Sequence, residues 1–217
     1  MYKYVKRGFD ILLAILLIAV LGIPMIIIAC LIRLEDGGPA IFKQKRMGKD
    51  LKPFEIYKFR SMISNRKELE GKLSHDEMTT KIGKFIRKTS LDELPQIFNV
   101  LKGEMSFIGP RPWVLEYYEW LTPVQKRRCN VLPGISGLAQ VRGRNGISVL
   151  RKIECDLEYI NHFGIKYDIK ILIETIKVIL GKKNSEITEM GIKDEIDVLQ
   201  NNPKTIKKNK NKMQATV

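Results

Sequence analysis

The chain has 217 residues, 44% of them apolar, and carries 38 Lys and Arg against 24 Asp and Glu, for a formal net charge of +14. That length suits one modest domain with one core, the apolar content excludes a disordered polycation, and the positive excess predicts an anionic partner. Three cysteines without a C-x-x-C pair and two histidines, His75 and His162, argue against a disulfide scaffold, a zinc finger and a histidine-based triad, and favour a reducing compartment.

The first predicted element is the uncharged apolar segment Ile11–Ile32. It is long enough to cross a hydrocarbon core of about 30 Å as one helix. Pro24 removes a backbone donor near its middle, so we expect a kink there. Basic residues flank both ends, which a re-entrant helix returning to the cytoplasmic face satisfies and a plain span does not. A cleaved secretory signal, with a lipoprotein-like box ending at Cys30, is a third interpretation.

A turn at residues 36–39 ends this element, and the globular part begins there. The β-favouring runs Ile41–Phe42 and Phe54–Phe59 lie on either side of Gly48, which predicts a short hairpin. Residues 64–80 are polar and are predicted to form a connection with one helical stretch, Asn65–Leu73.

The next segment, residues 89–103, has the pattern of a capped helix. Ser90 fits an N-cap, Glu93 follows three residues later as in a capping box, and Gly103 ends the apolar periodicity. Asp92 and Glu93 therefore have two interpretations. They can be ordinary acidic residues of a first helical turn, or a carboxylate that attacks an activated phosphorus and a neighbour that holds Mg²⁺ or acts as a base.

Glycine- and proline-rich loops are predicted at 105–112 and 132–141, with a helix over Trp113–Leu121 between them. Two later helices start near Ser148 and Asp168. The second has an apolar face that suits either a core or a membrane interface equally well. That face consists of Ile169, Leu172, Ile173, Ile176, Ile179 and Leu180.

Several basic and polar residues outside the Asp92–Glu93 pair are candidates for binding a phosphorylated ligand. Arg111 lies between two prolines, whose stiff backbone would present its guanidinium to a phosphate with little entropy loss. Glycines near residues 134–146 permit close approach of a ligand, and the neighbouring polar side chains could contact phosphate, ribose or base. The full set is Lys58, Arg60, Arg87, Arg111, Gln140, Arg142, Arg144 and Asn145.

Residues 3–181 resemble the bacterial sugar transferase family, the monotopic phosphoglycosyl transferases. The resemblance rests on ordered motifs, among them Gly38-Pro39-Ala-Ile-Phe-Lys-Gln, Tyr57-Lys-Phe-Arg-Ser-Met62, the stretch from Arg87 to Gly103, Ser106-Phe-Ile-Gly-Pro-Arg-Pro112 and Pro133-Gly-Ile-Ser-Gly-Leu-Ala-Gln-Val141. The chain departs from the family pattern at Ile23, where members often have Ser before the membrane proline, and at Arg142, where many have Asn.

The resemblance implies transfer of a sugar-1-phosphate from a UDP-sugar to polyprenyl phosphate, with release of UMP, as the first membrane step of polysaccharide or glycoconjugate synthesis. It implies that Asp92 is the nucleophile and that Glu93 assists, with Mg²⁺ held by both. By the same carry-over, Lys58, Arg87 and Arg111 bind phosphates. Asp156 belongs to the active-site surround.

The implied fold is α/β and mainly α, with a short β-hairpin, a re-entrant membrane helix and interfacial helices. We divide the chain into a membrane element (1–35), a catalytic domain (36–181) on the cytoplasmic face of the inner membrane, in contact with membrane lipids, and a Lys-rich tail (182–217) expected to be disordered. The oligomeric state has two alternatives, a monomer and a homodimer.

Two rival functions are a glycosyltransferase that releases UDP and a membrane-tethered nucleic-acid-binding protein, which the charge of +14 suggests. The second rival does not explain the Asp-Glu pair or the prolines around Arg111, so we expect no nucleic-acid partner. Product analysis separates the first rival from phosphosugar transfer.

Overall fold

The computed structural model describes residues 1–64, 74, 76–143, 146–180 and 192–201. The described part of the chain is mostly helical, with two small two-stranded sheets. It forms two compact units. Unit 1 comprises residues 1–6, 45–54 and 104–217, and unit 2 comprises residues 7–44 and 55–103. The division made from composition at residues 36 and 182 therefore differs from the division by compactness, and the predicted Asn65–Leu73 helix lies outside the described residues.

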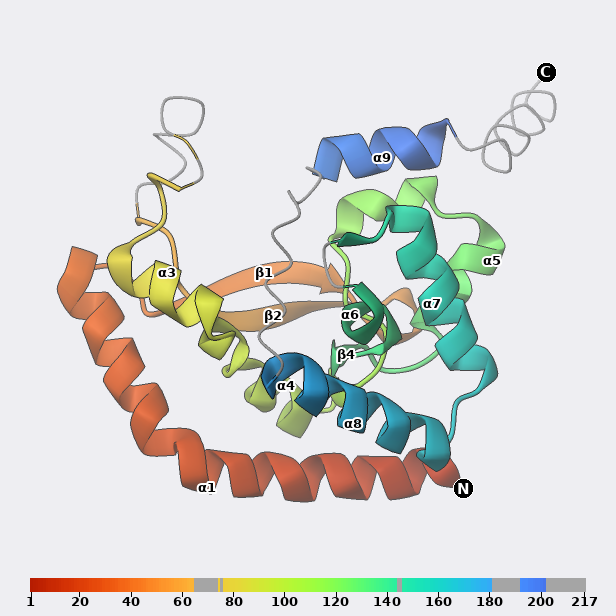
Figure 1. Ribbon diagram of the computed structural model, residues 1–217, viewed down its shortest axis with the longest axis horizontal. Helices are drawn as coiled ribbons and strands as arrows, with labels where there is room; N and C mark the ends of the chain where they lie inside the picture. The colour runs from red at the N-terminus through yellow and green to blue at the C-terminus, as the bar shows by residue number, and fades with distance from the viewer. Residues whose placement is uncertain (65–73, 75, 144–145, 181–191, 202–217) are drawn as a thin grey trace. The chain divides into compact units, whose positions relative to one another are not determined.

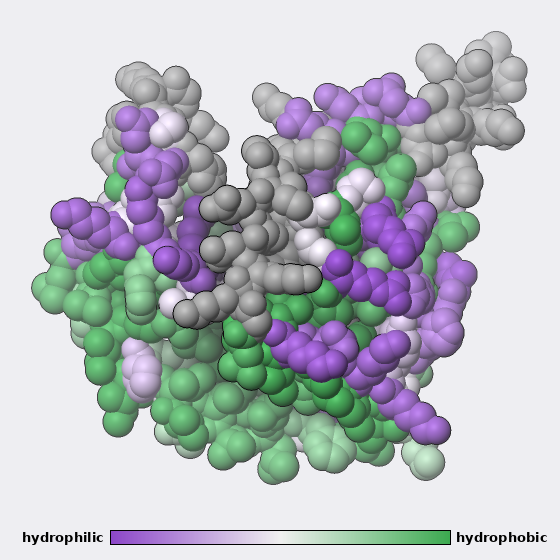
Figure 2. All heavy atoms as spheres, in the orientation of Figure 1, coloured by the Kyte–Doolittle hydropathy of each residue, from purple (hydrophilic) through white to green (hydrophobic). Residues whose placement is uncertain are grey.

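The N-terminal helix α1 (Tyr2–Asp36) contains the whole predicted apolar segment. Among the described residues, it alone is long and apolar enough to cross a membrane, judged by length and composition. Figure 1 shows a sharp bend in this helix. Pro24 is the only proline in α1, and its ring displaces the carbonyl of Val20 one turn earlier, which accounts for the bend. The surface over α1 is predominantly hydrophobic in the space-filling view (Figure 2).

The predicted hairpin is present as β1 (Ile41–Met47) and β2 (Pro53–Phe59), which pair in one sheet. The connection contains a short 3₁₀ turn, η1 (Lys49–Leu51), and the Gly48 N–H donates to the Lys52 carbonyl at 2.9 Å. The base of the hairpin belongs to unit 2 and its tip to unit 1.

Unit 2 continues with α3 (Lys81–Lys88), the 3₁₀ turn η2 (Leu91–Glu93) and α4 (Gln96–Lys102). Gly103 ends α4 in the left-handed conformation (φ 84°), as its position in the sequence predicted. The core of the unit joins the second half of α1 to β2 and α3, because Met25, Ile32, Phe59 and Ile86 pack as one buried cluster. The apolar N-terminal helix is thus part of the folded body of unit 2.

Unit 1 contains a second sheet in which β3 (Ser106–Ile108) and β4 (Gly134–Ser136) are parallel, with Ser106 opposite Gly134. Its helical elements are η3 (Leu115–Trp120), α5 (Pro123–Lys126), η4 (Arg127–Cys129), α6 (Leu138–Gly143), α7 (Val149–Asn161), α8 (Ile165–Leu180) and α9 (Ile192–Gln200). Ser148 caps α7 by accepting the Arg151 N–H at 3.3 Å, as predicted. The helix predicted over Trp113–Leu121 is shorter and 3₁₀ in type.

The first turn of α1 is fixed within unit 1 by the buried carboxylate of Asp168. Tyr2 and Lys6 both donate to Asp168 Oδ2, and Tyr159 donates to Oδ1 at 2.7 Å. Lys6, which lies just before the predicted membrane segment, therefore forms an ion pair inside the protein.

The predicted apolar face of α8 is exposed. Its members expose between 42% and 77% of their surface, whereas Ile171 on the other side of the helix is fully buried. Of the two interpretations of this face, burial in a core does not fit the structure, and contact with a membrane interface stays a prediction.

Residues 192–200, which belong to the segment expected to be disordered, form α9. Leu199 is fully buried in a cluster with Met47, Trp113 and Tyr117, and Lys152 donates to Glu195 at 2.6 Å. Composition alone did not indicate this helix, because its stability comes from a few apolar contacts to residues distant in sequence.

Candidate active site

The Asp92–Glu93 pair lies in η2, and the predicted capping box does not form. Ser90 has a left-handed backbone (φ 59°), and its side chain caps no helix. The Ser90 N–H instead donates to the Arg87 carbonyl at 3.1 Å, so Ser90 ends α3 where the pattern had it begin α4. A left-handed conformation is unfavourable for a non-glycine residue by about 1 kcal/mol. The predicted Ser90 capping box is therefore wrong, whereas Asp92 and Glu93 do lie in the first turn of a short 3₁₀ helix.

Glu93 is held by a lysine from the hairpin. Lys58 Nζ, near the end of β2, donates to Glu93 Oε1 at 2.7 Å, and both side chains are about one-fifth exposed. Asp92 is also half-buried and precedes Glu93 directly. Unit 2 thus brings together a lysine and two adjacent carboxylates, as expected of a site that neutralises a phosphate next to a carboxylate nucleophile.

The other two basic candidates of unit 2 have different partners. The Arg60 guanidinium is buried, pairs with Asp36 and lies 3.5 Å from the Ile32 carbonyl. Arg87, at the end of α3, is exposed, and its Nε donates to Ser61 Oγ at 2.8 Å. Arg87 can therefore reach a ligand in solvent, whereas Arg60 supports the end of α1.

In unit 1, Asp156 holds the Pro110–Pro112 loop through Arg128. Arg128 Nε and Nη2 donate to Asp156 Oδ2 at 2.9 and 2.6 Å, and both side chains are only 2% exposed. Arg128 Nη2 also donates to the Arg111 carbonyl at 2.7 Å. Burial raises the pKa of the Asp156 carboxyl, and the nearby guanidinium lowers it to a smaller extent. Asp156 therefore acts on the loop, while the side chain of Arg111 is exposed.

The two glycine-rich loops of unit 1 are joined backbone to backbone. The Gly109 N–H donates to the Ser136 carbonyl and the Gly134 N–H to the Pro110 carbonyl, both at 2.9 Å. A Cβ at Gly134 would lie 2.1 Å from the Gly109 nitrogen, a distance that no side chain tolerates. Only glycine allows the two loops to approach so closely.

The remaining candidates lie on or beside α6. Gln140 has a half-buried side chain. Arg142 forms a forked ion pair with Glu158 of α7, with Nη2 to Oε1 at 2.6 Å. Arg144 and Asn145 lie outside the described residues. The structure therefore places Arg142 in a contact between two helices.

We expect the Arg142–Glu158 pair to make unit 1 less stable in acid. Hydrogen bonds from Arg142 and Tyr167 lower the pKa of Glu158 from 4.5 to about 2. A carboxylate with a lowered folded-state pKa stabilises the protein above pH 4.5, and this contribution is lost as the pH falls towards 2. Because the pair is about one-third exposed, Glu158→Gln should cost about 1 kcal/mol at pH 7 and less at pH 3.

Urea unfolding at pH 7 and pH 3 measures this difference. Glu154→Gln, which removes an exposed pair with Arg151 on the same helix, is the control and should cost only a few tenths of a kcal/mol at either pH. An equal loss for Glu158→Gln at both pH values would contradict the prediction.

The residues around this site match a known family. The bacterial sugar transferase family model covers residues 1–182. The chain belongs to the bacterial sugar transferase family. This transferase is 46% identical over 197 residues to the galactosyl transferase CpsE of Streptococcus agalactiae serotype III (strain NEM316), covering 82% of this chain and 44% of CpsE.

Two further relatives are matched over a similar share of this chain. The uncharacterized sugar transferase EpsL of Bacillus subtilis (strain 168) is 44% identical, over 84% of this chain and 91% of EpsL. The UDP-glucose:undecaprenyl-phosphate glucose-1-phosphate transferase of Escherichia coli (strain K12) is 41% identical, over 80% of this chain and 40% of that enzyme. The transferase thus spans nearly all of EpsL and less than half of the other two.

Sequence reasoning did not find Arg128, Asp36 or Glu35. Arg128 looks like one half of an exposed Arg-Arg pair, and only the fold shows that it is buried against Asp156. Glu35 and Asp36 precede a glycine turn, where charged residues are common. No local pattern distinguishes them from surface acids.

Proposed function

We propose that this transferase moves a sugar-1-phosphate from a UDP-sugar to polyprenyl phosphate, with undecaprenyl phosphate as the carrier, and releases UMP. The observation that supports this most directly is the Asp92–Glu93 turn. Both carboxylates lie in this short turn, and Glu93 is held 2.7 Å from the Lys58 ammonium. The names of relatives, which include an undecaprenyl-phosphate glucose-1-phosphate transferase, support the same substrate class.

The proposed reaction has two displacements at one phosphorus atom. An oxygen of the Asp92 carboxylate attacks the β-phosphorus of the UDP-sugar, and the bond from that phosphorus to the bridging oxygen breaks, so that UMP leaves. A phosphate oxygen of the polyprenyl carrier then attacks the same phosphorus. The bond to Asp92 breaks, the carboxylate is regenerated, and the product is a polyprenyl diphosphosugar.

The residues of unit 2 can supply the charge that these steps require. The Lys58 ammonium lies next to the carboxylates and can bind a phosphate oxygen while Glu93 fixes its position. Arg87 is exposed and can bind a second phosphate oxygen. The exposed Arg111 of unit 1 can bind phosphate in its own right. Arg60, Arg142 and Asp156 make structural contacts, so we assign them supporting roles.

Asp92 and Glu93 also suit Mg²⁺. No group of three or more metal-binding side chains occurs among the described residues. Mg²⁺ commonly binds one or two carboxylates and completes its shell with water and substrate phosphates, so an adjacent pair is a fitting donor set. When bound, the ion would neutralise phosphate charge. Asp92 and Glu93 would hold it.

Helices α1 and α8 support a proposed membrane placement. We propose that bent α1 enters and leaves the cytoplasmic face of the inner membrane and that α8 lies in the interface, which makes the polyprenyl phosphate headgroup accessible. The exposed apolar face of α8 supports this arrangement. The sequence before residue 182 carries +11 of the total +14, which suits a surface of anionic lipid and phosphorylated substrates.

A product assay tests the proposal. The full chain, in detergent or nanodiscs, is incubated with a panel of UDP-sugars, Mg²⁺ and undecaprenyl phosphate, and the released nucleotide is identified. UMP that appears together with a lipid diphosphosugar supports phosphosugar transfer and the first membrane step of polysaccharide or glycoconjugate synthesis. Release of UDP would identify a glycosyltransferase, and no nucleotide release from any donor would contradict both activities.

A further inference from the structure

The candidate catalytic turn lies in the middle of one continuous run of chain. Helix α3 leads into η2, which carries Asp92 and Glu93, and η2 leads into α4. Whatever fixes the start of α3 and the end of α4 therefore fixes both sides of the turn. In this structure, side chains of α1 do so at each end.

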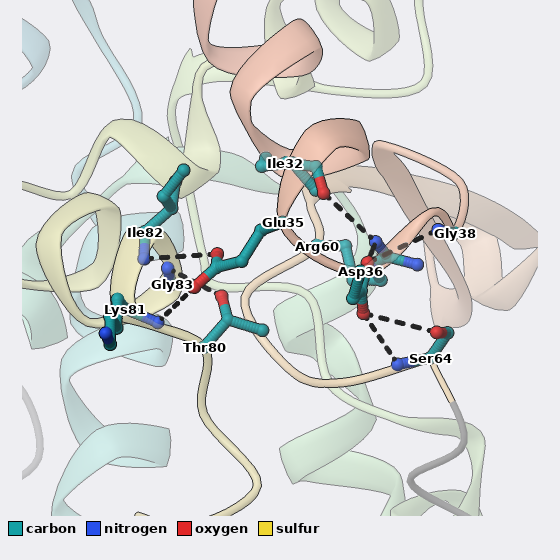
Figure 3. A network of polar contacts seen from close by, with 10 residues as sticks. All are labelled: Ile32, Glu35, Asp36, Gly38, Arg60, Ser64, Thr80, Lys81, Ile82 and Gly83. Carbon is teal, nitrogen blue, oxygen red and sulfur yellow. Dashed lines mark hydrogen bonds and ion pairs between the residues drawn. The ribbon is translucent and has the colours of Figure 1, made fainter.

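Glu35, in the last turn of α1, holds the start of α3 (Figure 3). Its two carboxylate oxygens accept the N–H groups of Lys81 and Ile82 at 2.7 and 3.3 Å. Thr80 Oγ1 accepts the Gly83 N–H at 2.9 Å, so the first three donors of α3 all have side-chain acceptors. A carboxylate at this position also complements the positive end of the helix dipole.

Arg7, near the start of α1, holds the end of α4. Its guanidinium donates to the carbonyls of Val100 and Leu101, with Nη2 at 2.9 Å from the Leu101 oxygen. These carbonyls belong to the last turn of α4, where a helix lacks internal donors and favours positive charge. A carboxylate and a guanidinium of the same helix thus bind opposite ends of the α3–η2–α4 run.

Asp36 connects the strand of Lys58 to the same end of α1. Its carboxylate pairs with Arg60, which follows β2 directly, and Oδ2 accepts the Ser64 N–H at 3.0 Å (Figure 3). Arg60 is two residues beyond Lys58, the partner of Glu93. Both chain segments that carry the candidate site are therefore bound to the last turn of α1.

We propose that Glu35, Asp36 and Arg7 are positioning residues for the Asp92–Glu93 turn, and that α1 acts as a brace across the catalytic segment as well as a membrane anchor. Pro24 lies between Arg7 and Glu35, so the bend of α1 sets the separation of the two ends it holds. This inference rests on the proposed function for its catalytic consequence. The contacts themselves do not depend on that function.

Glu35→Ala and Glu35→Gln in the full chain in nanodiscs containing phosphatidylglycerol test the brace. We expect Glu35→Ala to speed amide hydrogen exchange at Lys81 and Ile82 about five-fold, the size expected for loss of a helix cap. Exchange at Glu93 and Leu94, whose N–H groups close the η2 turn, should rise as well. The kcat of UMP release should fall about ten-fold with little change in KM for the UDP-sugar, because binding groups stay while alignment is lost. Glu35→Gln keeps one acceptor oxygen and should recover most of both.

Asp76→Ala is the matched control, because Asp76 forms a largely exposed pair with Lys84 of α3. It should leave exchange and kcat unchanged. Unchanged exchange at Glu93 and Leu94 in Glu35→Ala would overturn the inference, and so would faster exchange with an unaltered kcat. If the wild type releases no UMP from any donor, the proposed function fails, and the exchange at Glu93 and Leu94 alone decides whether α1 positions the turn.

Discussion

Replacing Asp92 by asparagine is expected to abolish phosphosugar transfer while the fold is kept. Asparagine has the same shape but no anionic oxygen to attack phosphorus, and loss of a covalent nucleophile lowers kcat by factors of about 10³ to 10⁶. Because asparagine keeps the size and one acceptor oxygen of the aspartate, unfolding stability should change by less than about 1 kcal/mol. The measurement is the covalent label on the protein after incubation with a UDP-[¹⁴C]sugar and Mg²⁺, together with UMP release.

Glu93→Gln is the companion variant, because it weakens the bond to Lys58 and leaves the nucleophile in place. It should still accept label, more slowly than the wild type. A labelled Asp92→Asn protein would show that the sugar phosphate is attached elsewhere, and label in neither the wild type nor a variant would argue for direct transfer without a covalent intermediate.

Replacing Arg128 by methionine is expected to cost about 3 to 5 kcal/mol of unfolding free energy, because it leaves the buried Asp156 carboxylate without its counter-charge. Burial already raises the pKa of Asp156. An acid with a raised folded-state pKa binds protons more readily in the folded protein, so the variant should regain stability as the pH falls from 8 to 5. Urea unfolding across this range measures the effect.

Arg127→Met is the control for that experiment, since Arg127 is the exposed neighbour and donates to Asn161 at 3.2 Å. It should change stability by less than about 0.5 kcal/mol. A loss below about 1 kcal/mol for Arg128→Met would show that water or another group neutralises Asp156. Asp156→Asn removes the buried charge and should be milder than Arg128→Met.

Local signals in the sequence were sufficient for several elements. The hairpin, the Ser148 cap of α7 and the left-handed Gly103 at the end of α4 all depend on residues within a few positions of each other. Such features follow from side-chain hydrogen bonds and backbone conformation, so pattern reasoning predicts them.

Where tertiary contacts decide, the sequence was insufficient. Ser90 matched an N-cap pattern, yet it lies at the end of α3. The helix α3 itself was not predicted from the sequence. The parallel pairing of β3 with β4 joins segments about 28 residues apart in sequence, and no local rule specifies it. The amphipathic pattern of α8 was correct but could not tell whether protein or solvent faces its apolar side.

The site was predictable to a similar degree. Asp92, Glu93 and Lys58 were all named from the sequence, and the structure shows which of them are in contact. Arg60 and Asp156 have charges that resemble those of ligand-binding residues, but burial pairs them with Asp36 and Arg128. Charge in a sequence marks both kinds of residue alike, and only burial and partners separate them.

The glycine contact between the two loops of unit 1 limits how these loops can be exchanged with those of relatives. The Gly134 backbone packs directly on Gly109, and the side chains of Ile108 and Leu138 lie in one buried cluster, so residues 106–112 and 133–143 are fitted closely to each other. In a chimera that takes only one loop from a relative, we expect the new loop to fit poorly against the original partner loop. The two segments should be transplanted together, as a single cassette.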